Sequence, residues 1–573
     1  MERRAGPDLH GGHRVARDRW RDRRACAPGR DHAPPTDPRR ALRRRDPQRH
    51  RPDRLVPRVR AAGPAHGPDP PPLRGRGLAG DDRHRAALAV RRRVRGPRAR
   101  PLLRRLHPHP RGHRVTAGAP VRLVVVGLGV TGDAVLRWAA AAGHHAVVVD
   151  DRPDSVAPAR RAVADALGVA VTAVPTGADA AALLAGTDLV VPSPGVPAHH
   201  PFLRAAATAG VPRRSEVDLA AELLAASGRT LVAITGTNGK TTVTELAVAV
   251  CRAGGVAAVA AGNIGAPLLD EAVAGTDPVV VAEVSSFQLA GTTAAFRPRV
   301  AGFLNLAADH LDWHGTFTAY GEAKARIFAH QGPGDVLVAS ADDPEVAALA
   351  ATTPGRLVTF SVAPTADTGY RIGARADGAV LLTDDDREIV PVAAVRDPAP
   401  HDLANALAAS ALAAAAGVDP VQGGAALRDF VKGDHRMRVV AEIDGVPMID
   451  DSKATNVHAA LAAIRSFPRV VLIAGGRNKG LDLSTLRGGA DHLAAVVAIG
   501  DAATEIAAAF RGVVPVSEAG SMDAAVRAAV DHAAVGDVVL LSPACASFDW
   551  YGSYAERGRD FARAVAALVE VRS

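Results

Sequence analysis

The chain of 573 residues is long enough for three or four domains of ordinary size. Its formal net charge of +9 averages two unlike parts: residues 1–120 carry 33 Arg, no Lys and 11 acidic side chains, whereas the rest carries 36 basic and 49 acidic side chains. The three cysteines (Cys26, Cys251 and Cys545) lie far apart and form no CxxC pair, which argues against a disulfide scaffold or a zinc ribbon. Since the chain shows neither a transmembrane-length apolar run nor a signal peptide, we expect a cytoplasmic protein.

Residues 1–117 form an extension rich in Arg, His and Pro that shows neither helical nor strand periodicity. Such a composition is typical of a disordered tail or of an arm that binds nucleic acid. Because Arg occurs here without any Lys, codon bias in GC-rich DNA explains the charge better, and we expect translation to start near Val115. A protein that begins at residue 115 should then keep full activity and lose only salt-sensitive adhesion to polyanions.

Order is expected to begin at a buried strand, Val121–Val126, within a first block that spans residues 118–214. A glycine-rich turn and a helix through Ala142 follow the strand, and a second strand, Ala146–Val149, ends at Asp150. Strand, glycine turn, helix, strand and terminal acid make one βαβ unit.

Two further α/β blocks follow, at residues 215–433 and 434–573. The second block begins with the strand Thr230–Ile234, and the third begins with a hairpin over Val439–Ile449. Further strands in the third block are expected at Val470–Ala474, Ala494–Ile499, Val513–Val516 and Val538–Leu541. The sequence therefore predicts an α/β fold of three consecutive Rossmann-like or P-loop-type domains.

The first glycine turn, Gly127-x-Gly129-x-x-Gly132, has the spacing of a dinucleotide-binding fingerprint, with Asp150 about twenty residues further on. Glycines at these positions let backbone N–H groups approach a pyrophosphate at a helix N-terminus. The pattern indicates a ligand with a diphosphate, which leaves NAD, FAD and other nucleotides open.

The second glycine turn lies between the strand Thr230–Ile234 and a helix over Val243–Cys251. It offers backbone amides for phosphates, a Lys for the β- and γ-phosphates and a hydroxyl for Mg²⁺. Ile234 stands where the first glycine of the general P-loop pattern would be. We predict that nucleotide phosphates are bound by Gly236, Thr237, Asn238, Gly239, Lys240, Thr241 and Thr242.

Acidic and imidazole side chains follow the later strands of this block. Glu283 ends a wholly apolar strand, Val279–Ala282, where a carboxylate is hard to explain by packing, so we predict a metal ligand. His310 lies between two acids in Asp309-His-Leu-Asp312, and a histidine in such a place is more often structural. From the sequence alone, Lys324 would be a solvated lysine on a helix.

Several ordered motifs of the chain resemble those of the Mur ligases. They are Thr235–Thr242, Gly262–Gly265, Glu283–Leu289, Asp309–Asp312, Asp451–Asn456 and Ser542–Asp549, and the resemblance covers about residues 118–573. It implies a UDP-sugar in the first domain, ATP in the second and an amino acid in the third. The activity implied is ATP-dependent ligation of D-glutamate to UDP-N-acetylmuramoyl-L-alanine through an acyl phosphate, with ADP and phosphate released. This reaction serves peptidoglycan synthesis, and through it cell shape, cell division and the cell cycle.

The resemblance also implies roles for individual residues. Thr241 and Glu283 hold one Mg²⁺, His310 becomes a ligand of a second Mg²⁺, and Lys324 becomes a carbamylated lysine that supports the metal site. Further ATP contacts fall on Asn405, Arg436 and Asp451, and Lys453 joins Lys240, Glu283, His310 and Lys324 as catalytic. The UDP-sugar and glutamate contacts fall on Val130, Thr131, Asp150, Asp151, Arg152, Ser193, Gly195, Asn263, Thr455, Lys479, Ser547 and Tyr554.

Two positions depart from the family pattern. Asp402 stands where the middle domain usually has Asn, which puts one amide contact to ATP in doubt, and Tyr554 stands where Phe is familiar. The alternatives are a Mur ligase for another amino acid, folylpolyglutamate synthetase and an NAD-dependent oxidoreductase. We expect a monomer that binds neither a specific nucleic acid nor a membrane.

Overall fold

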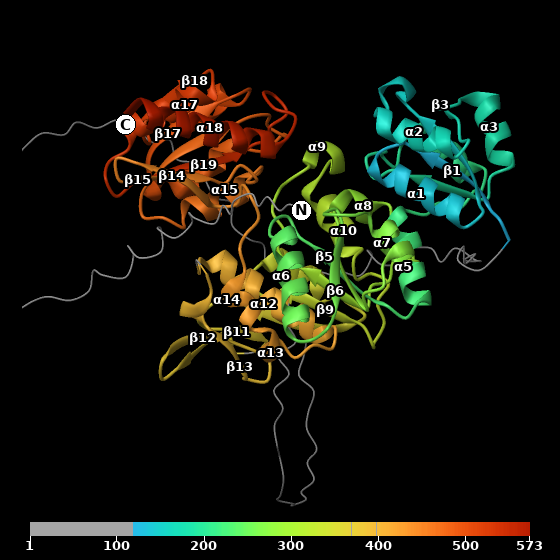
Figure 1. Ribbon diagram of the computed structural model, residues 1–573, viewed down its shortest axis with the longest axis horizontal. Helices are drawn as coiled ribbons and strands as arrows, with labels where there is room; N and C mark the ends of the chain where they lie inside the picture. Colours follow the sequence, from blue (N-terminus) through green and yellow to red (C-terminus); the bar gives the residue numbers. More distant parts are fainter. Residues whose placement is uncertain (1–118, 368, 397, 573) are drawn as a thin grey trace, which may run out of the picture. The chain divides into compact units, whose positions relative to one another are not determined.

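The computed structural model describes residues 119–367, 369–396 and 398–572 (Figure 1). These residues form three α/β domains, each built on a sheet of its own, which confirms the predicted fold class. The predictions for the basic extension, residues 1–117, lie outside the described part. Among the described residues, no helix is long and apolar enough to cross a membrane.

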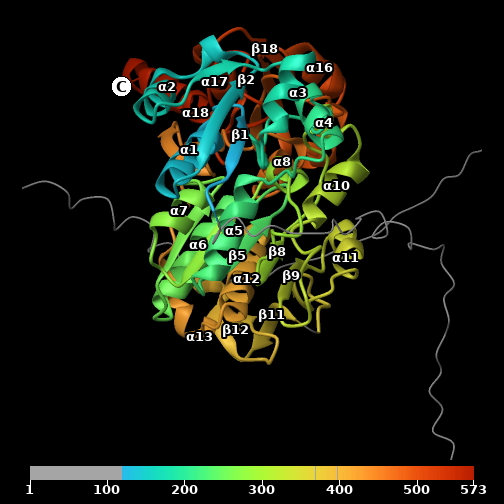
Figure 2. The same cartoon turned by 90° about the vertical axis from the view of Figure 1, so that its right-hand side faces the viewer.

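The first domain contains a parallel four-stranded sheet in the order β3-β2-β1-β4. Its central strand β1 is apolar on both faces because helices cover both: Leu123 and Val125 pack toward α1 and α2, whereas Val124 and Val126 pack toward α3 and α4. In Figure 2 these two pairs of helices lie on opposite sides of β1 and β2. The elements are β1 (Arg122–Val126), α1 (Val130–Ala141), β2 (His145–Asp150), η3 (Pro153–Ser155), α2 (Pro158–Ala166), β3 (Val171–Ala173), α3 (Gly177–Ala185), β4 (Leu189–Pro192) and α4 (Pro201–Thr208).

The second domain contains a nine-stranded sheet in the order β13-β12-β11-β10-β9-β8-β5-β7-β6. Strands β5 to β10 pair in parallel, and β11 to β13 add an antiparallel edge that the sequence had not indicated. Its helical and strand elements begin with α5 (Glu216–Ala226), β5 (Thr230–Thr235), α6 (Lys240–Ala253), β6 (Ala258–Gly262), α7 (Leu268–Ala274), β7 (Val279–Glu283), α8 (Ser286–Ala290) and β8 (Val300–Phe303). They continue with α9 (Leu311–His314), α10 (Phe317–Ala325), β9 (Val336–Ser340), α11 (Pro344–Ala350), β10 (Arg356–Ser361), β11 (Tyr370–Arg375), β12 (Gly378–Leu382), β13 (Glu388–Pro391), η4 (Val392–Ala394), α12 (Pro400–Ala415), α13 (Pro420–Gly423) and α14 (Ala425–Asp429).

The third domain contains a six-stranded sheet in the order β14-β15-β19-β16-β17-β18, antiparallel only between β14 and β15. The predicted hairpin is present, and Asp444 and Gly445 both adopt positive φ in its turn. The elements are β14 (Arg438–Ile443), β15 (Val446–Asp450), α15 (Val457–Ile464), β16 (Val470–Gly475), η5 (Leu483–His492), β17 (Leu493–Ile499), α16 (Ala503–Phe510), β18 (Val516–Ala519), α17 (Met522–His532), β19 (Val538–Ala544) and α18 (Tyr554–Arg572).

The predicted strand Val513–Val516 is wrong. The structure begins β18 at Val516, and Val513 is an exposed turn residue after α16. The register with β17 starts at Val516, opposite Val496, because the carbonyl of Pro515 accepts the N–H of Val496. The prediction, which relied on a short valine run next to a proline, therefore placed the strand three residues too early.

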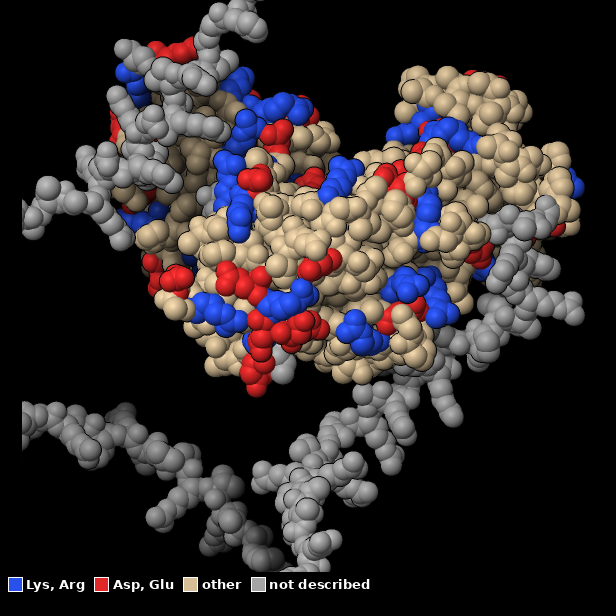
Figure 3. Space-filling view, turned by 60° about the horizontal axis from the view of Figure 1, so that its bottom comes forward, with Lys and Arg blue, Asp and Glu red and all other residues tan. Residues whose placement is uncertain are grey.

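Basic and acidic side chains are intermixed on the face of the described residues that Figure 3 presents.

Candidate functional site

The carboxyl ends of β5, β7 and β8 meet at one edge of the second sheet because these strands are parallel neighbours. The loop after β5 leads directly into α6, with Gly239 in the left-handed region (φ 81°) at the helix N-cap. Lys240 folds back over the loop, and its Nζ donates to the carbonyls of Gly236 and Thr237, each at 2.9 Å. The loop thus has the geometry of a phosphate-binding loop at a helix N-terminus.

Asn305, which the sequence analysis missed, holds this loop in shape. Its Oδ1 accepts from the N–H of Asn238 at 2.8 Å, and its Nδ2 donates to the carbonyl of Asn238 at 3.1 Å. Its own carbonyl accepts from the N–H of Thr237 at 3.0 Å. The sequence did contain a signal for Asn305: its amide side chain follows the apolar strand β8 and Leu304, just as the carboxylate of Glu283 ends an apolar strand.

Glu283 is 3% exposed at the end of β7, where a buried carboxylate requires partners. The hydroxyl of Thr241 donates to its Oε2 at 2.7 Å, and Nδ2 of Asn263 donates to its Oε1 at 2.9 Å. The structure therefore brings together two predicted metal-site residues. It also places Asn263, predicted to contact the UDP-sugar, on the same carboxylate.

Lys324 is 1% exposed, so the reading of a solvated helix lysine is wrong. Its Nζ donates to the carbonyl of Gly236 at 2.7 Å and lies 4.7 Å from the centre of the Tyr320 ring. Desolvation, and next the charge of Lys240, hold the pKa of Lys324 well below its ordinary value. Burial of this kind favours the unprotonated form of the amine.

His310 and Asp309 follow β8 at the same edge. His310 has a left-handed backbone (φ 54°), and its ring centre lies 4.8 Å from that of Phe287. Burial lowers the pKa of His310 to about 4, so the imidazole is neutral at pH 7, as a metal ligand must be. Oδ1 of Asp309 accepts from Nζ of Lys479 at 2.5 Å, and its Oδ2 accepts from Asn456 at 3.1 Å. Lys479, predicted to bind glutamate, is thus paired with a carboxylate of the second domain.

Three of the predicted third-domain residues, Asp451, Lys453 and Tyr554, lie near the end of β15 and the start of α18. Nζ of Lys453 donates to the hydroxyl of Tyr554 at 3.3 Å and lies 4.8 Å from the centre of its ring. Asp451 accepts from Ser542 at 2.9 Å, and burial raises its pKa to about 7. Ser547 is buried and Thr455 is half-buried.

Two cavities of 190 and 490 Å³ adjoin the phosphate loop. The smaller one is also lined by Gly239, Asn405, Asp451 and Lys453, so it joins the loop to predicted ATP contacts. Among the described residues, the buried Nη2 of Arg436 has no hydrogen-bond partner, as expected of a cation that meets an anionic ligand. The residues common to both cavities are Thr242, Asp402, Lys432, Arg436 and Met437.

In the first domain, the glycine turn is shaped by side chains at the ends of β2 and β4. Oδ2 of Asp150 accepts the N–H of Leu128 at 2.8 Å, and the hydroxyl of Ser193 donates to the carbonyl of Gly127 at 2.7 Å. A Cβ at Gly132 would lie 2.3 Å from that same carbonyl oxygen, so only glycine fits there. Asp150 and Ser193, which were predicted to contact the UDP-sugar, therefore hydrogen-bond the backbone of the glycine turn.

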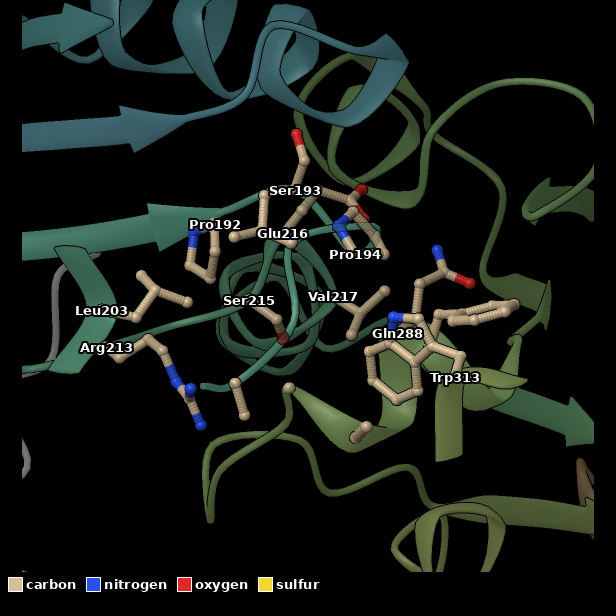
Figure 4. A pocket seen from close by; sticks show the side chains of 15 residues that line it. Pro192, Ser193, Pro194, Leu203, Arg213, Ser215, Glu216, Val217, Gln288 and Trp313 are labelled. Carbon is tan, nitrogen blue, oxygen red and sulfur yellow. The ribbon is translucent and has the colours of Figure 1, made fainter. Parts of the chain in front are cut away.

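Figure 4 shows a small pocket with Pro192, Leu203 and Arg213 on one side and Gln288 and Trp313 on the other. Its volume of 40 Å³ is too small for a nucleotide sugar. Ser193, a predicted UDP-sugar contact, lines it together with Glu216. The other predicted UDP-sugar contacts do not line this pocket: Val130 is exposed and Asp151 pairs with His200 at 3.0 Å. Also outside it lie Thr131, Arg152 and Gly195.

Within the described ranges, no three His, Cys, Asp or Glu side chains are close enough to hold a metal ion by themselves. The donors present at the loop are one hydroxyl, one buried carboxylate and one neutral imidazole. The hydroxyl and the carboxylate fit Mg²⁺, which prefers oxygen ligands, keeps several waters and uses few protein ligands together with substrate phosphates.

Three family models match consecutive parts of the chain. The Mur ligase MurD-like N-terminal domain matches residues 121–214, the Mur ligase middle domain matches 234–413, and the Mur ligase glutamate ligase domain matches 435–545. Each matched range contains one of the three sheets or most of it.

Relatives and solved structures agree with these matches. The chain is 46% identical over 462 residues to UDP-N-acetylmuramoylalanine–D-glutamate ligase of Frankia casuarinae, covering 79% of this chain and 94% of that one. The ligase of the same name from Thermobifida fusca is 42% identical, covering 78% and 98%. A crystal structure of MurF from Acinetobacter baumannii shares the fold, with a TM-score of 0.50 and 16% identity over 77% of this chain and 93% of that one. The chain therefore belongs to the Mur ligase family.

Proposed function

We propose that this protein is an ATP-dependent carboxylate–amine ligase that joins D-glutamate to UDP-N-acetylmuramoyl-L-alanine, with release of ADP and phosphate, in peptidoglycan precursor synthesis. The main observation in support is that the phosphate loop, two carboxylates of the second domain and a lysine of the third domain lie close together. The charges of Glu283 and Asp309 both act on Lys240, and Asp309 in turn holds Lys479 of the third domain. The names of the close relatives support the choice of substrates.

We assign the UDP-sugar to residues 118–214, ATP to residues 215–433 and glutamate to residues 434–573. The glycine turn that Asp150 and Ser193 shape supports the first assignment, because a UDP diphosphate needs the same close backbone approach as a dinucleotide. The cavities beside the loop support the second.

The reaction first makes the alanyl carboxylate electrophilic. A carboxylate oxygen attacks the γ-phosphorus of ATP, ADP leaves, and an acyl phosphate forms. The amine of glutamate then attacks the carbonyl carbon, loses a proton and expels phosphate. Because both reactants of the first step are anions, catalysis depends on positioning and charge neutralisation. Lys240 on the loop and Lys453, which lines the same cavity as Asp451, supply cations for this purpose.

Mg²⁺ would be held by Thr241 and Glu283, with His310 and Lys324 at a second position. When bound, the ion supplies positive charge to the phosphate oxygens. The burial that lowers the pKa of Lys324 favours the unprotonated amine, which can add to CO₂ with loss of a proton; the carbamate that results would bring a carboxylate to the site. The deep pKa depression and the family resemblance are the support for this assignment.

Glutamate carries two carboxylates, which require cations and hydroxyl donors. Lys479, Ser547, Thr455 and Tyr554 offer them, so we propose these residues as the amino-acid pocket. On this proposal Lys479 exchanges its partner Asp309 for a substrate carboxylate during the cycle. The reaction would take place in the cytoplasm, by a monomer, and would support cell shape and cell division.

An assay of ADP release tests the function. The full chain is incubated with ATP, Mg²⁺, UDP-N-acetylmuramoyl-L-alanine and one amino acid from a panel of D-glutamate, L-glutamate, L-alanine and diaminopimelate. Release that depends on D-glutamate supports the proposal. Release with another amino acid would make the protein a Mur ligase of different specificity, and no release with any of them would refute the assignment.

A further inference from the structure

Arg557 is a buried cation in the third domain that the sequence analysis did not single out. It lies in the first turn of α18, which packs against β14 and β15 (Figure 1), and it is only 1% exposed. The strands β15, β19 and β16 are parallel neighbours in that order, so their carboxyl ends meet at one edge of the sheet. The loops that leave this edge carry most of the residues that we assign to glutamate.

The guanidinium of Arg557 holds the backbone at all three strand ends. Its Nη1 donates to the carbonyl of Gly475, the last residue of β16, at 3.4 Å and to that of Cys545, directly after β19, at 3.1 Å. Its Nε and Nη2 donate to Oγ and to the carbonyl of Ser452, two residues after β15, at 3.0 and 2.9 Å. In the described part of the chain Arg557 forms no ion pair, so three carbonyls and one hydroxyl take the place of a carboxylate.

The loops after β16 and β19 are joined directly beside these contacts. The N–H of Arg477 donates to the carbonyl of Ala546 at 2.8 Å, and the N–H of Ala546 donates to the carbonyl of Arg477 at 3.1 Å. A Cβ at Gly476 would lie 2.2 Å from the carbonyl oxygen of Ala546 and 3.1 Å from Nη1 of Arg557. Only glycine therefore lets the two loops and the guanidinium approach one another this closely.

The side chains that we assign to the reaction follow these anchored positions closely. Lys479 lies four residues after the held carbonyl on β16, and Ser547 lies two residues after the held carbonyl beyond β19. Lys453 directly follows Ser452, whose Oγ also donates to the carbonyl of Tyr554 at 2.8 Å. One guanidinium thus connects the loops on which the amino-acid pocket depends.

We propose that Arg557 is the positioning residue of the glutamate pocket, and that its fork of donors sets the distance between Lys479 and Ser547 without contact with the substrate. This inference rests on the proposed function in that these loops bind the amino acid. A planar guanidinium suits the task because its donors point in fixed directions toward separate oxygens. Although burial lowers the pKa of Arg557 to about 10, the side chain remains a cation at pH 7.

Arg557→Lys tests the fork, because it keeps the charge but offers a single ammonium that cannot reach oxygens on three loops. ADP release is measured while D-glutamate, ATP or UDP-N-acetylmuramoyl-L-alanine is varied. We expect KM for D-glutamate to rise about tenfold or more, the factor for one weakened charged hydrogen bond, and the other two KM values to stay within about twofold. A merely structural role would reduce the amount of active enzyme, which lowers turnover and leaves every KM unchanged.

The ATP contacts should be spared because the loop after β15 has further anchors. The N–H of Asp451 donates to the carbonyl of Leu541 at 2.9 Å, and the N–H of Ser452 donates to Oδ1 of Asp450 at 2.9 Å. Neither hydrogen bond involves Arg557, so both persist in the variant.

A milder variant and a matched control accompany this test. Ser452→Ala removes one partner of the fork and keeps the others, so it should raise KM for glutamate by a smaller factor, about threefold. Arg563→Lys is the same change on the same helix, in an exposed guanidinium that pairs with Asp523 and Asp560. It should leave all three KM values unaltered.

Amide hydrogen exchange gives a readout that does not depend on activity. In Arg557→Lys, exchange should become about tenfold faster in peptides from the loops after β16 and β19, where Arg477 and Ala546 are joined. Peptides from β17, which Arg557 does not contact, should keep their wild-type rates.

The outcomes separate this inference from the proposed function. An unchanged KM for glutamate, equal changes in all three KM values, or wild-type exchange in both loops would overturn the positioning role of Arg557. The wild-type enzyme tests the function by itself: if it uses another amino acid, the substrate assignment falls, and the KM comparison is made with that amino acid. Thermal melting shows whether each variant is folded, and if Arg557→Lys is not, Ser452→Ala decides by the same KM comparison.

Discussion

Glu216 should make the stability of the second domain depend on pH. It is the first residue of α5, is 3% exposed, and its Oε1 accepts the N–H of Leu269 at 2.6 Å in the first turn of α7. Desolvation by burial raises its pKa from 4.5 to about 7, and the backbone hydrogen bonds only partly offset that rise. The folded state therefore holds this proton more tightly than the unfolded state.

The direction follows from that difference. The protonated carboxyl contributes stability that is fully present below pH 4.5 and is lost as pH rises through 7. A difference of about 2.5 pKa units corresponds to about 3 kcal/mol in total, of which about 2.5 kcal/mol falls between pH 5 and pH 8. For a cooperative unit of this size, the melting temperature should fall by roughly 5–10 °C over that range from this group alone.

Glu216→Gln removes the titration but keeps an oxygen that can accept from Leu269. Melting temperatures at pH 5, 6, 7 and 8 should therefore decline less for this variant, and at pH 8 it should be more stable than the wild type. Glu345→Gln, at an exposed position on α11, is the control and should follow the wild-type curve. A Glu216→Gln variant with the full wild-type pH dependence, or one that is less stable at pH 8, would refute the reasoning.

Three predictions concern the reaction, and ADP release measures all of them. Lys240→Ala should reduce turnover by about 10²–10³ or more, because it removes a preorganised cation from the phosphoryl group; near-normal turnover would sink the phosphate-loop assignment. Lys479→Ala or Ser547→Ala should raise KM for glutamate far more than KM for ATP, and equal effects would argue against a dedicated amino-acid pocket. Lys324→Ala should lose activity although this lysine attacks no substrate, and full activity in the variant would refute the carbamate.

Most of the architecture could be predicted from local sequence. The runs of Val and Ala in β1, β5, β7 and β16 are buried on both faces, so each reads as a parallel strand whatever lies beside it. Gly236 directly after β5, with Gly239 and Lys240 following it, likewise indicated the phosphate loop, although Asn305, 67 residues after Asn238, holds that loop in shape. Where local signals conflict, as in the valine run beside Pro515, the prediction failed by a few residues.

The environment of each side chain was decided only by the tertiary structure. Lys324 looks like any lysine on a helix, yet it is buried because α10 packs its face against the phosphate loop, where Nζ finds the carbonyl of Gly236 88 residues earlier. Lys479 reaches Asp309 across 170 residues, and Asp402 finds Lys432 thirty residues later. Burial and charge pairing depend on which segments meet in space, so a side chain's pKa and partner follow from the packing. The order of most elements along the chain follows from local periodicity, which the sequence itself carries.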